Sequence, residues 1–248
     1  RQRQMCIRDR NMSNNDVSAC SLMADYLDSI GAGKILVDRG PLSFDWTPPS
    51  LVGRDKELGI LASMFMGIGN EGVSGRAVVI GHVGTGKTVL TRRFGEDVVR
   101  ELDGVRKMTL SHVNCRNHPS TNQVLQQIAL SLDSRHPERG FSSGEIIQSI
   151  RRNIRSRGLH MILVLDEVDV LIRRDNSDLI YKLLRIDEGQ GGQGTISLIL
   201  VSQDLALMGM MEPAIISRLG ESNVLKLEPY GYDGLIGISK QRYEASCR

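Results

Sequence analysis

A glycine-rich segment carries the residue types and spacing with the most definite chemistry. Residues 81–88 read GHVGTGKT and match the pattern G-x-x-x-x-G-K-[ST] at every fixed position. Small residues allow consecutive backbone N–H groups to turn towards phosphate oxygens, and a following helix adds its positive end. The spacing therefore predicts a phosphate-binding loop, with Lys87 at the β- and γ-phosphates and the Thr88 hydroxyl on Mg²⁺. The alternative is a glycine-rich turn that matches by chance.

A second motif supplies two carboxylates. Residues 162–167 read ILVLDE, so an apolar run predicts a buried strand that presents Asp166 at its carboxyl end, where open α/β sheets bind ligands. We expect Asp166 to hold the Mg²⁺ shell and Glu167 to polarise an attacking water as a general base. A strand that ends in acidic residues is common by itself, and the preceding phosphate-binding loop makes the pair specific. For Asp169 we predict the N-cap of a helix.

The surrounding pattern indicates the elements that position these groups. An apolar run at 76–81 precedes the loop, and an amphipathic helix with Leu90, Phe94 and Val98 on one face follows it. Further strands are predicted at 105–113, 160–165, 195–201 and 223–227. Further helices are predicted at 55–66, 123–132, 179–186, 213–219 and from a Ser142–Glu145 capping box to Ile154. Strands that alternate with helices predict a parallel sheet covered on both faces.

Composition excludes several classes of protein. The 248 residues include 31 Lys+Arg and 29 Asp+Glu, and 40% are hydrophobic, which excludes global disorder. No apolar run approaches the ~18 residues of a membrane helix, and the four Cys show no paired metal-ligand spacing. Residues 1–10 read RQRQMCIRDR, and without them the formal net charge changes from +2 to −1. We interpret residues 1–12 as a non-native tail, with a basic nucleic-acid arm as the alternative.

With these motifs, the chain resembles the AAA+ ATPases of the initiator group, and most closely the archaeal origin-recognition and cell-division-control (Orc/Cdc-type) replication initiators. The likeness rests on GHVGTGKT, ILVLDEVDVL and PPSLVGRDKEL, with weaker blocks such as VNCRN, SLILVSQD and EPAIISRLG in the same order. It implies a three-layer αβα P-loop core with a five-stranded parallel sheet, followed by a helical lid and a winged-helix domain. We expect an approach segment at 13–49, the ATPase core at 50–228 and the start of the lid at 229–248, in a chain truncated before the winged helix.

The resemblance also implies roles for individual residues. Arg218, in ISRLG, occupies the arginine-finger block, from which it would complete a neighbouring subunit's site; an arginine that caps a helix end is the alternative. Gln203 stands where the family presents an Asn to the γ-phosphate, and its extra methylene changes the reach of the amide, which predicts slow hydrolysis. The residues expected to enclose the nucleotide are Val52, Gly53, Arg54, Gly81, His82, Val83, Gly84, Thr85, Gly86, Lys87, Thr88, Val89 and Tyr230.

Two basic regions raise the question of DNA contact. The helix at 123–132 resembles an element with which relatives touch origin DNA, and there only its polar face and the loop near Arg135 and Arg139 could meet phosphate. Arginines also cluster at the end of the next helix, where they alternate with isoleucines. That spacing predicts a solvated helix face rather than a DNA-binding surface for Arg151, Arg152, Arg155 and Arg157.

The resemblance implies a replication initiator that recognises origin DNA, binds and slowly hydrolyses ATP as a conformational switch, and helps to load the replicative helicase. The alternatives are a clamp-loader-like or other AAA+ remodelling ATPase, and a nucleotide-binding scaffold without catalysis. We expect ATP or ADP with Mg²⁺ as cofactors. The expected partners are duplex DNA, bound mainly through the winged helix, a second copy of the chain or the helicase, without a membrane, at the nucleoid in the cytoplasm.

Overall fold

The computed structural model describes residues 38–43, 45–137, 140–186 and 194–247. The expected tail at 1–12 therefore lies outside the described residues, as does Arg139. The chain divides into two compact units. The larger runs from Pro49 to Leu235, and the smaller combines the described residues up to Pro48 with those from Ile236 onwards. Within the described ranges, no helix has the length and apolar character needed to cross a membrane.

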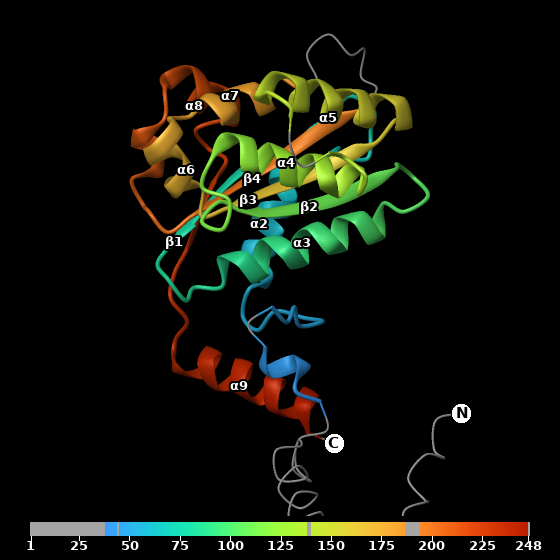
Figure 1. The fold of residues 1–248 in the computed structure, drawn as a ribbon. Coiled ribbons are helices and arrows are strands. Elements are labelled where there is room, and N and C mark those ends of the chain that lie inside the picture. The colour runs from blue at the N-terminus through green and yellow to red at the C-terminus, as the bar shows by residue number, and fades with distance from the viewer. Residues whose placement is uncertain (1–37, 44, 138–139, 187–193, 248) are drawn as a thin grey trace, which may run out of the picture. The chain divides into compact units, whose positions relative to one another are not determined.

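A five-stranded parallel sheet forms the centre of the larger unit, as the sequence predicts (Figure 1). Its order is β2-β3-β4-β1-β5, so β4 separates the two strands that carry the sequence motifs. The register aligns Leu165 with Leu200 and Val79 with Val201, which brings the carboxyl ends of β3, β4 and β1 to one edge. The strands are β1 (Arg76–Gly81), β2 (Met108–Asn114), β3 (His160–Asp166), β4 (Thr195–Ser202) and β5 (Val224–Leu227).

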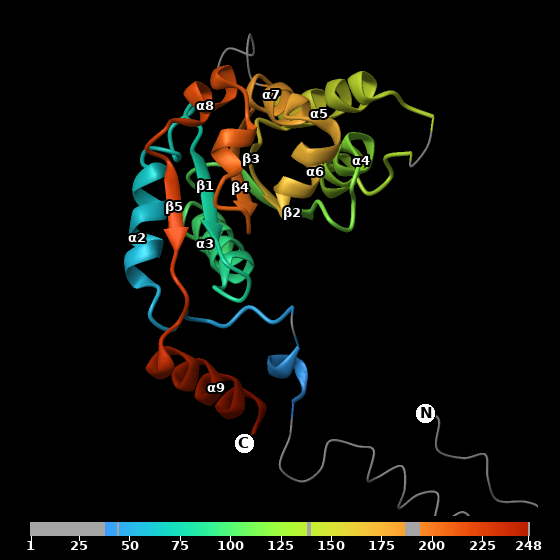
Figure 2. The ribbon, with the colours of Figure 1, turned by 90° about the vertical axis from the view of Figure 1, so that its left-hand side faces the viewer.

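Helices cover both faces of this sheet, with α3 on the opposite face from α4 and α5 (Figures 1 and 2). Successive strand residues point to opposite faces, so Ile162 and Val164 join the core under α2 and α3, while Leu163 and Leu165 join the core under α4 to α8. The helices are α2 (Asp55–Met64), α3 (Lys87–Glu101), α4 (Thr121–Leu132), α5 (Ser143–Arg157), α6 (Val168–Asp175), α7 (Asp178–Leu184), α8 (Pro213–Leu219) and α9 (Tyr232–Ser246).

The local signals that begin α5 are confirmed, whereas the one at α6 is wrong. The Ser142 side chain accepts a hydrogen bond from the Glu145 amide, and the Glu145 carboxylate accepts one from the Ser142 amide, which is the predicted capping box. Asp169 is not an N-cap, because α6 already begins at Val168 with Glu167 in the capping position. Asp169 is instead buried in the first turn of α6 and accepts a hydrogen bond of 2.8 Å from Ser202 Oγ at the end of β4.

A buried histidine joins strands at the amino edge of the sheet. His160 begins β3 with none of its side chain exposed, and its ring nitrogens contact Thr195 Oγ1 at 2.5 Å and Ser197 Oγ at 2.9 Å. Arg106 donates to Thr195 Oγ1, and the Gly75 amide donates to Ser197 Oγ. Burial, assisted by the charge of Arg106, lowers the pKa of His160 to about 3. The imidazole therefore stays neutral in the folded protein at pH values where a free histidine is protonated.

This lowered pKa predicts a loss of stability in acid. The unfolded chain takes up a proton on His160 near pH ~6.5, and the folded chain does so only near pH 3, so the contribution is complete above pH ~6.5 and is lost as the pH falls towards 3. Between pH 7.5 and pH 4.5 the free energy of unfolding should fall by about 2–3 kcal/mol less in His160→Gln than in the natural sequence. Urea unfolding at the two pH values measures this difference, and an equal fall in both proteins would contradict it.

Candidate nucleotide-binding site

The glycine-rich loop joins β1 to α3 at the carboxyl edge of the sheet. Gly84 and Gly86 have φ angles of +81° and +84°, a region that strains other residues, and Gly86 directly precedes the first turn of α3. A Cβ atom on Gly81 would lie 2.6 Å from the carbonyl oxygen of Leu227 in the neighbouring strand β5. The two fixed glycines, Gly81 and Gly86, and Gly84 between them therefore each meet a backbone requirement of this loop.

The lysine of the motif folds back over the loop. Lys87 Nζ donates hydrogen bonds of 2.8 Å to the carbonyl oxygens of Gly81 and His82. Burial lowers the pKa of Lys87, and the nearby carboxylates of Asp166 and Glu167 partly oppose this effect. A phosphate oxygen would give the ammonium group a charged acceptor in place of neutral carbonyls, which adds the Coulombic attraction of opposite charges to the hydrogen bond.

The threonine of the motif meets the carboxylate of the second motif. Thr88 Oγ1 donates to Asp166 Oδ2 at 2.6 Å, across 78 residues of sequence. Asp166 is only 2% exposed, and its other oxygen accepts from the Glu167 amide at 2.9 Å. A hydroxyl and a carboxylate oxygen at hydrogen-bond distance are the ligand types that Mg²⁺ takes in phosphate-binding sites. The donor set therefore fits the expected Mg²⁺ ion.

A histidine that sequence reasoning did not select lies beside this pair. His112 Nε2, on β2, is 3.6 Å from Asp166 Oδ2, and among the described residues this buried nitrogen has no hydrogen-bond partner. Burial lowers the pKa of His112, the charge of Asp166 raises it, and the charge of Arg92 lowers it again. His112 lies close to Asp166 because β2 pairs with β3. The sequence pattern does not specify which strands pair, so it could not identify His112 as a site residue.

The expected general base is held by an arginine. Glu167 has a φ angle of +53°, and its carboxylate oxygen Oε2 lies 2.9 Å from Arg116 Nε in an ion pair. Arg116 follows β2, in a turn where the Asn114 side chain accepts hydrogen bonds from the amides of Arg116 and Asn117. The sequence VNCRN supports the family resemblance but contains no signal that identifies Arg116 as a site residue.

The structure places Gln203 and Arg218 at opposite ends of the sheet. Gln203 follows the last residue of β4, the strand between the Asp166 strand and the loop strand, and so belongs to the carboxyl edge. Arg218 lies at the other end, because its carbonyl accepts from Arg76 at the first residue of β1, about 16 Å of strand away from the loop. Its guanidinium carbon lies 5.8 Å from the ring centroid of Tyr181. Arg218 is therefore not brought to the loop of its own chain.

Arg54 links three segments around the loop. It is 4% exposed, and its Nη2 donates to the carbonyls of Thr85 at 2.9 Å and Glu228 at 2.7 Å, while Nη1 pairs with Glu57 at 2.7 Å. The guanidinium carbon also lies 4.1 Å from the ring centroid of Tyr230. Burial acts to lower the pKa of Arg54, but the contacts with Tyr230 and Glu57 outweigh it, and the pKa is raised. A permanent cation thus joins the segment before α2, the loop and the segment after β5.

The other residues expected around the nucleotide either precede this arginine in the chain, stack on it or belong to the loop. Val52 is half-buried, and Gly53 is exposed with a φ angle of +63°. Tyr230 lies against the loop, since a Cβ atom on Gly86 would be 3.3 Å from its hydroxyl oxygen. Within the loop, His82 and Val83 are exposed, whereas Thr85 is buried and Val89 is half-buried. The structure therefore brings these residues together around one loop.

Comparison with known proteins agrees with this geometry. Residues 73–210 match a family described as "AAA domain". The chain is 31% identical over 229 residues to an ORC1-type DNA replication protein of Desulfurococcus amylolyticus, an alignment that covers 90% of this chain and 57% of the relative. It also resembles the solved structure of the Aeropyrum pernix ORC1 protein in complex with DNA, with 29% identity, a TM-score of 0.77 and coverage of 87% of this chain and 56% of that one.

A second solved structure, Cdc6p from Pyrobaculum aerophilum, is similar at 25% identity and a TM-score of 0.73, with 86% of this chain and 55% of that chain covered. The chain thus spans little more than half the length of the relatives it matches.

Proposed function

This chain belongs to the AAA domain family, and from that premise we propose that it is an ORC1-type replication initiator, which binds ATP with Mg²⁺ as a conformational switch in the recognition of replication-origin DNA. The observation that carries the proposal is the 2.6 Å hydrogen bond from Thr88 to Asp166 beside the glycine-rich loop. It joins the two motifs that a P-loop ATPase needs at one point of the sheet edge.

Different residues of the chain would bind the phosphates, the Mg²⁺ ion and the base of ATP. The loop amides and the N-terminal end of α3 face the phosphates, and Lys87 exchanges its two carbonyl acceptors for phosphate oxygens. Thr88 and Asp166 would hold Mg²⁺, which neutralises phosphate charge when it is bound. Arg54 keeps the loop carbonyl of Thr85 fixed against the segment that leads to Tyr230, and Val52 and Gly53 complete the wall for the base.

Hydrolysis requires Glu167 to accept a proton from the attacking water. Its carboxylate is engaged by Arg116 at 2.9 Å, so this ion pair must open before the carboxylate can act as a base. Gln203 would present its amide from the end of β4, with a longer reach than an asparagine. Both features support slow turnover as part of the proposal.

The proposed partners follow from the relatives and from the placement of Arg218. A solved relative is an ORC1 protein in complex with DNA, which supports duplex DNA as a partner. Arg218 lies far from the loop of its own chain, so the arginine-finger role would require a second copy, whose site it would complete. We place the protein at the nucleoid in the cytoplasm, and helicase loading remains the proposed outcome of the switch.

The proposal is tested by measuring ATP binding, ATP turnover and duplex-DNA binding on the same preparation. We expect tight ATP binding, slow turnover and a DNA affinity that falls steeply with salt. Fast turnover by a ring-shaped assembly would instead favour a remodelling ATPase, and ATP binding with neither turnover nor DNA affinity would favour a scaffold.

Shortening the amide at the end of β4 should increase turnover. Gln203→Asn restores the side-chain length that we associate with presentation to the γ-phosphate, so we expect kcat for ATP to rise severalfold with little change in ATP affinity. The matched control is Gln127→Asn on α4, which should leave kcat as it is. An unchanged or lower kcat in Gln203→Asn counts against the assigned role of Gln203.

A further inference from the structure

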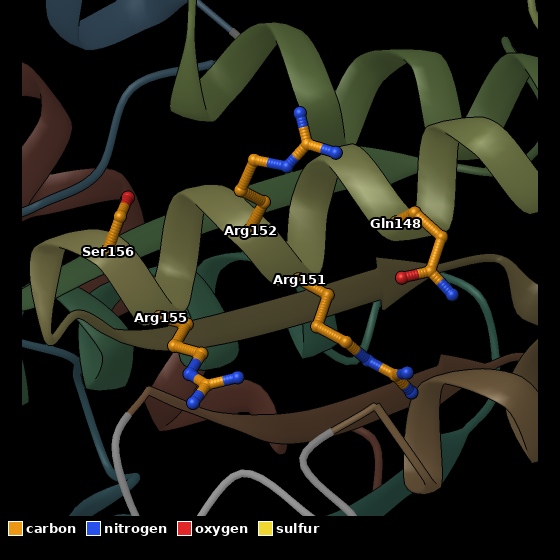
Figure 3. Close-up of a pocket in the computed structure, with 5 residues that line it drawn as sticks. All are labelled: Gln148, Arg151, Arg152, Arg155 and Ser156. Atoms are coloured by element: carbon orange, nitrogen blue, oxygen red, sulfur yellow. The ribbon is translucent and has the colours of Figure 1, made fainter.

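The outer face of α5 carries a concentration of positive charge that the nucleotide site does not use. Arg151, Arg152 and Arg155 line a surface hollow together with Gln148 and Ser156, and none of these lining residues is acidic (Figure 3). The opposite face of the helix packs into the core through Ile146, Ile150 and Ile154. We call the five lining residues the α5 basic face.

Two of these arginines have no carboxylate partner among the residues that the structure describes. Within the described part of the chain, the side chains of Arg152 and Arg155 form no hydrogen bond and no ion pair. Exposed arginines elsewhere in the larger unit behave differently, because Arg100 pairs with Asp97, Arg116 with Glu167 and Arg173 with Asp204. Like charges that gather on one helix face repel one another, and none of the described lining residues is acidic, so the α5 basic face favours an anionic partner.

Stabilisation of the C-terminal end of α5 explains the position of only some of these arginines. Cations in the last turn interact favourably with the helix dipole, which explains Arg155 and Arg157. Arg151 and Arg152 precede the last turn. The Arg151 guanidinium is also fixed in place, since its Nε donates to the carbonyl of Ile186 at 2.8 Å and its Nη2 to that of Arg185 at 3.4 Å.

The spacing of the arginines along α5 fits a polymer with regularly repeated negative charges better than a single small anion. Arg151 and Arg155 are one helical turn apart, about 6 Å along the axis, and Figure 3 shows both side chains projecting on the same side of α5. Gln148 lies one helical turn before Arg152 and Ser156 one turn after it, and both are neutral hydrogen-bonding groups of the kind that commonly contact phosphate (Figure 3). We propose that the α5 basic face binds the sugar–phosphate backbone of duplex DNA without reading its bases.

The choice of duplex DNA as the bound polyanion rests on the proposed function. The α5 basic face itself, however, lies away from the nucleotide-binding site. The arginines lie in the second half of α5, which leads into the amino end of β3, whereas Asp166 ends that strand about 20 Å away. Changes on the α5 basic face should therefore alter DNA binding and leave ATP binding as it is.

The test uses the whole chain and a labelled random-sequence duplex DNA, with affinity measured over a series of salt concentrations. Each phosphate contact adds about 0.9 to the slope of log affinity against log salt concentration. Arg152→Gln/Arg155→Gln should lower the slope by about 2 and weaken binding at low salt, with ATP affinity unchanged. Arg152→Lys/Arg155→Lys should keep the slope, and so should the control Lys56→Gln/Lys240→Gln, which removes two exposed charges elsewhere.

The possible failures are distinguishable. A natural-sequence chain that binds duplex DNA with the same salt slope as Arg152→Gln/Arg155→Gln overturns the inference and leaves the proposed function intact. A chain that binds ATP but no duplex DNA overturns the DNA part of the proposed function. Arg152→Gln/Arg155→Gln could instead lower the salt slope for binding to single-stranded RNA and leave the salt slope for duplex DNA unchanged. That result would overturn duplex DNA as the partner of the α5 basic face.

Discussion

Replacement of Lys87 by alanine should abolish ATP binding, with a loss of affinity on the order of 100-fold or more. Lys87 is the cation of the glycine-rich loop, and its ammonium group donates hydrogen bonds to the loop carbonyls of Gly81 and His82. Removing it takes away the charged partner of the phosphates, whereas the buried carboxylate of Asp166 keeps its hydrogen bonds from Thr88 and from the next backbone amide. Equilibrium binding of a fluorescent ATP analogue measures the effect.

The matched control for this experiment is Lys56→Ala, because Lys56 is exposed on α2 and is not one of the residues expected around the nucleotide. It should bind ATP as the natural sequence does. Thermal unfolding should give nearly equal midpoints for both variants in the absence of nucleotide, since neither lysine supports the core. Retained ATP affinity in Lys87→Ala would refute the phosphate-binding assignment of the loop.

Replacement of Arg54 by methionine should cost both stability and ATP affinity. Methionine fills much of the volume but leaves the carbonyls of Thr85 and Glu228 and the carboxylate of Glu57 without their donor. Breaking such a buried, charged arrangement from one side costs about 3 kcal/mol. The loop also loses its link to the segment before Tyr230, so we expect at least tenfold weaker ATP binding.

Two further variants separate burial from charge. Arg54→Lys keeps the cation but cannot span two carbonyls while stacking on a ring, so its losses should be intermediate. Arg93→Met removes an arginine that pairs with Asp97 on the surface of α3, and should cost no more than about 1 kcal/mol. Chemical denaturation gives the stabilities, and equal losses in Arg54→Met and Arg93→Met would contradict the linking role of Arg54.

Features encoded within a few residues are the ones that the sequence predicts well. The loop glycines are recognisable because each meets a backbone requirement at a fixed spacing, and the Ser142–Glu145 capping box because both partners lie within one turn. The alternation of apolar strands with amphipathic helices was enough to predict the five parallel strands.

Features that depend on which strands are neighbours could not be predicted. Asp169 was assigned to a cap because its true partner, Ser202, lies at the end of another strand and only the sheet order brings it near. The Arg116–Glu167 ion pair likewise follows from the pairing of β2 with β3. Sequence periodicity reports burial and helix faces, but it carries no information about strand order.

The sheet order also fixes when the nucleotide site can form as the chain leaves the ribosome. β1 is the first strand to be synthesised, yet Val78 pairs with Leu200 on one side and Val224 on the other, both far along the chain. Gly81 similarly packs against Leu227, so the glycine-rich loop acquires its native surroundings only once β5 has emerged. Such distant parallel pairings form slowly, because a long loop must close before they stabilise anything. ATP, which would bind only the finished loop, should therefore favour completed chains over partly folded ones.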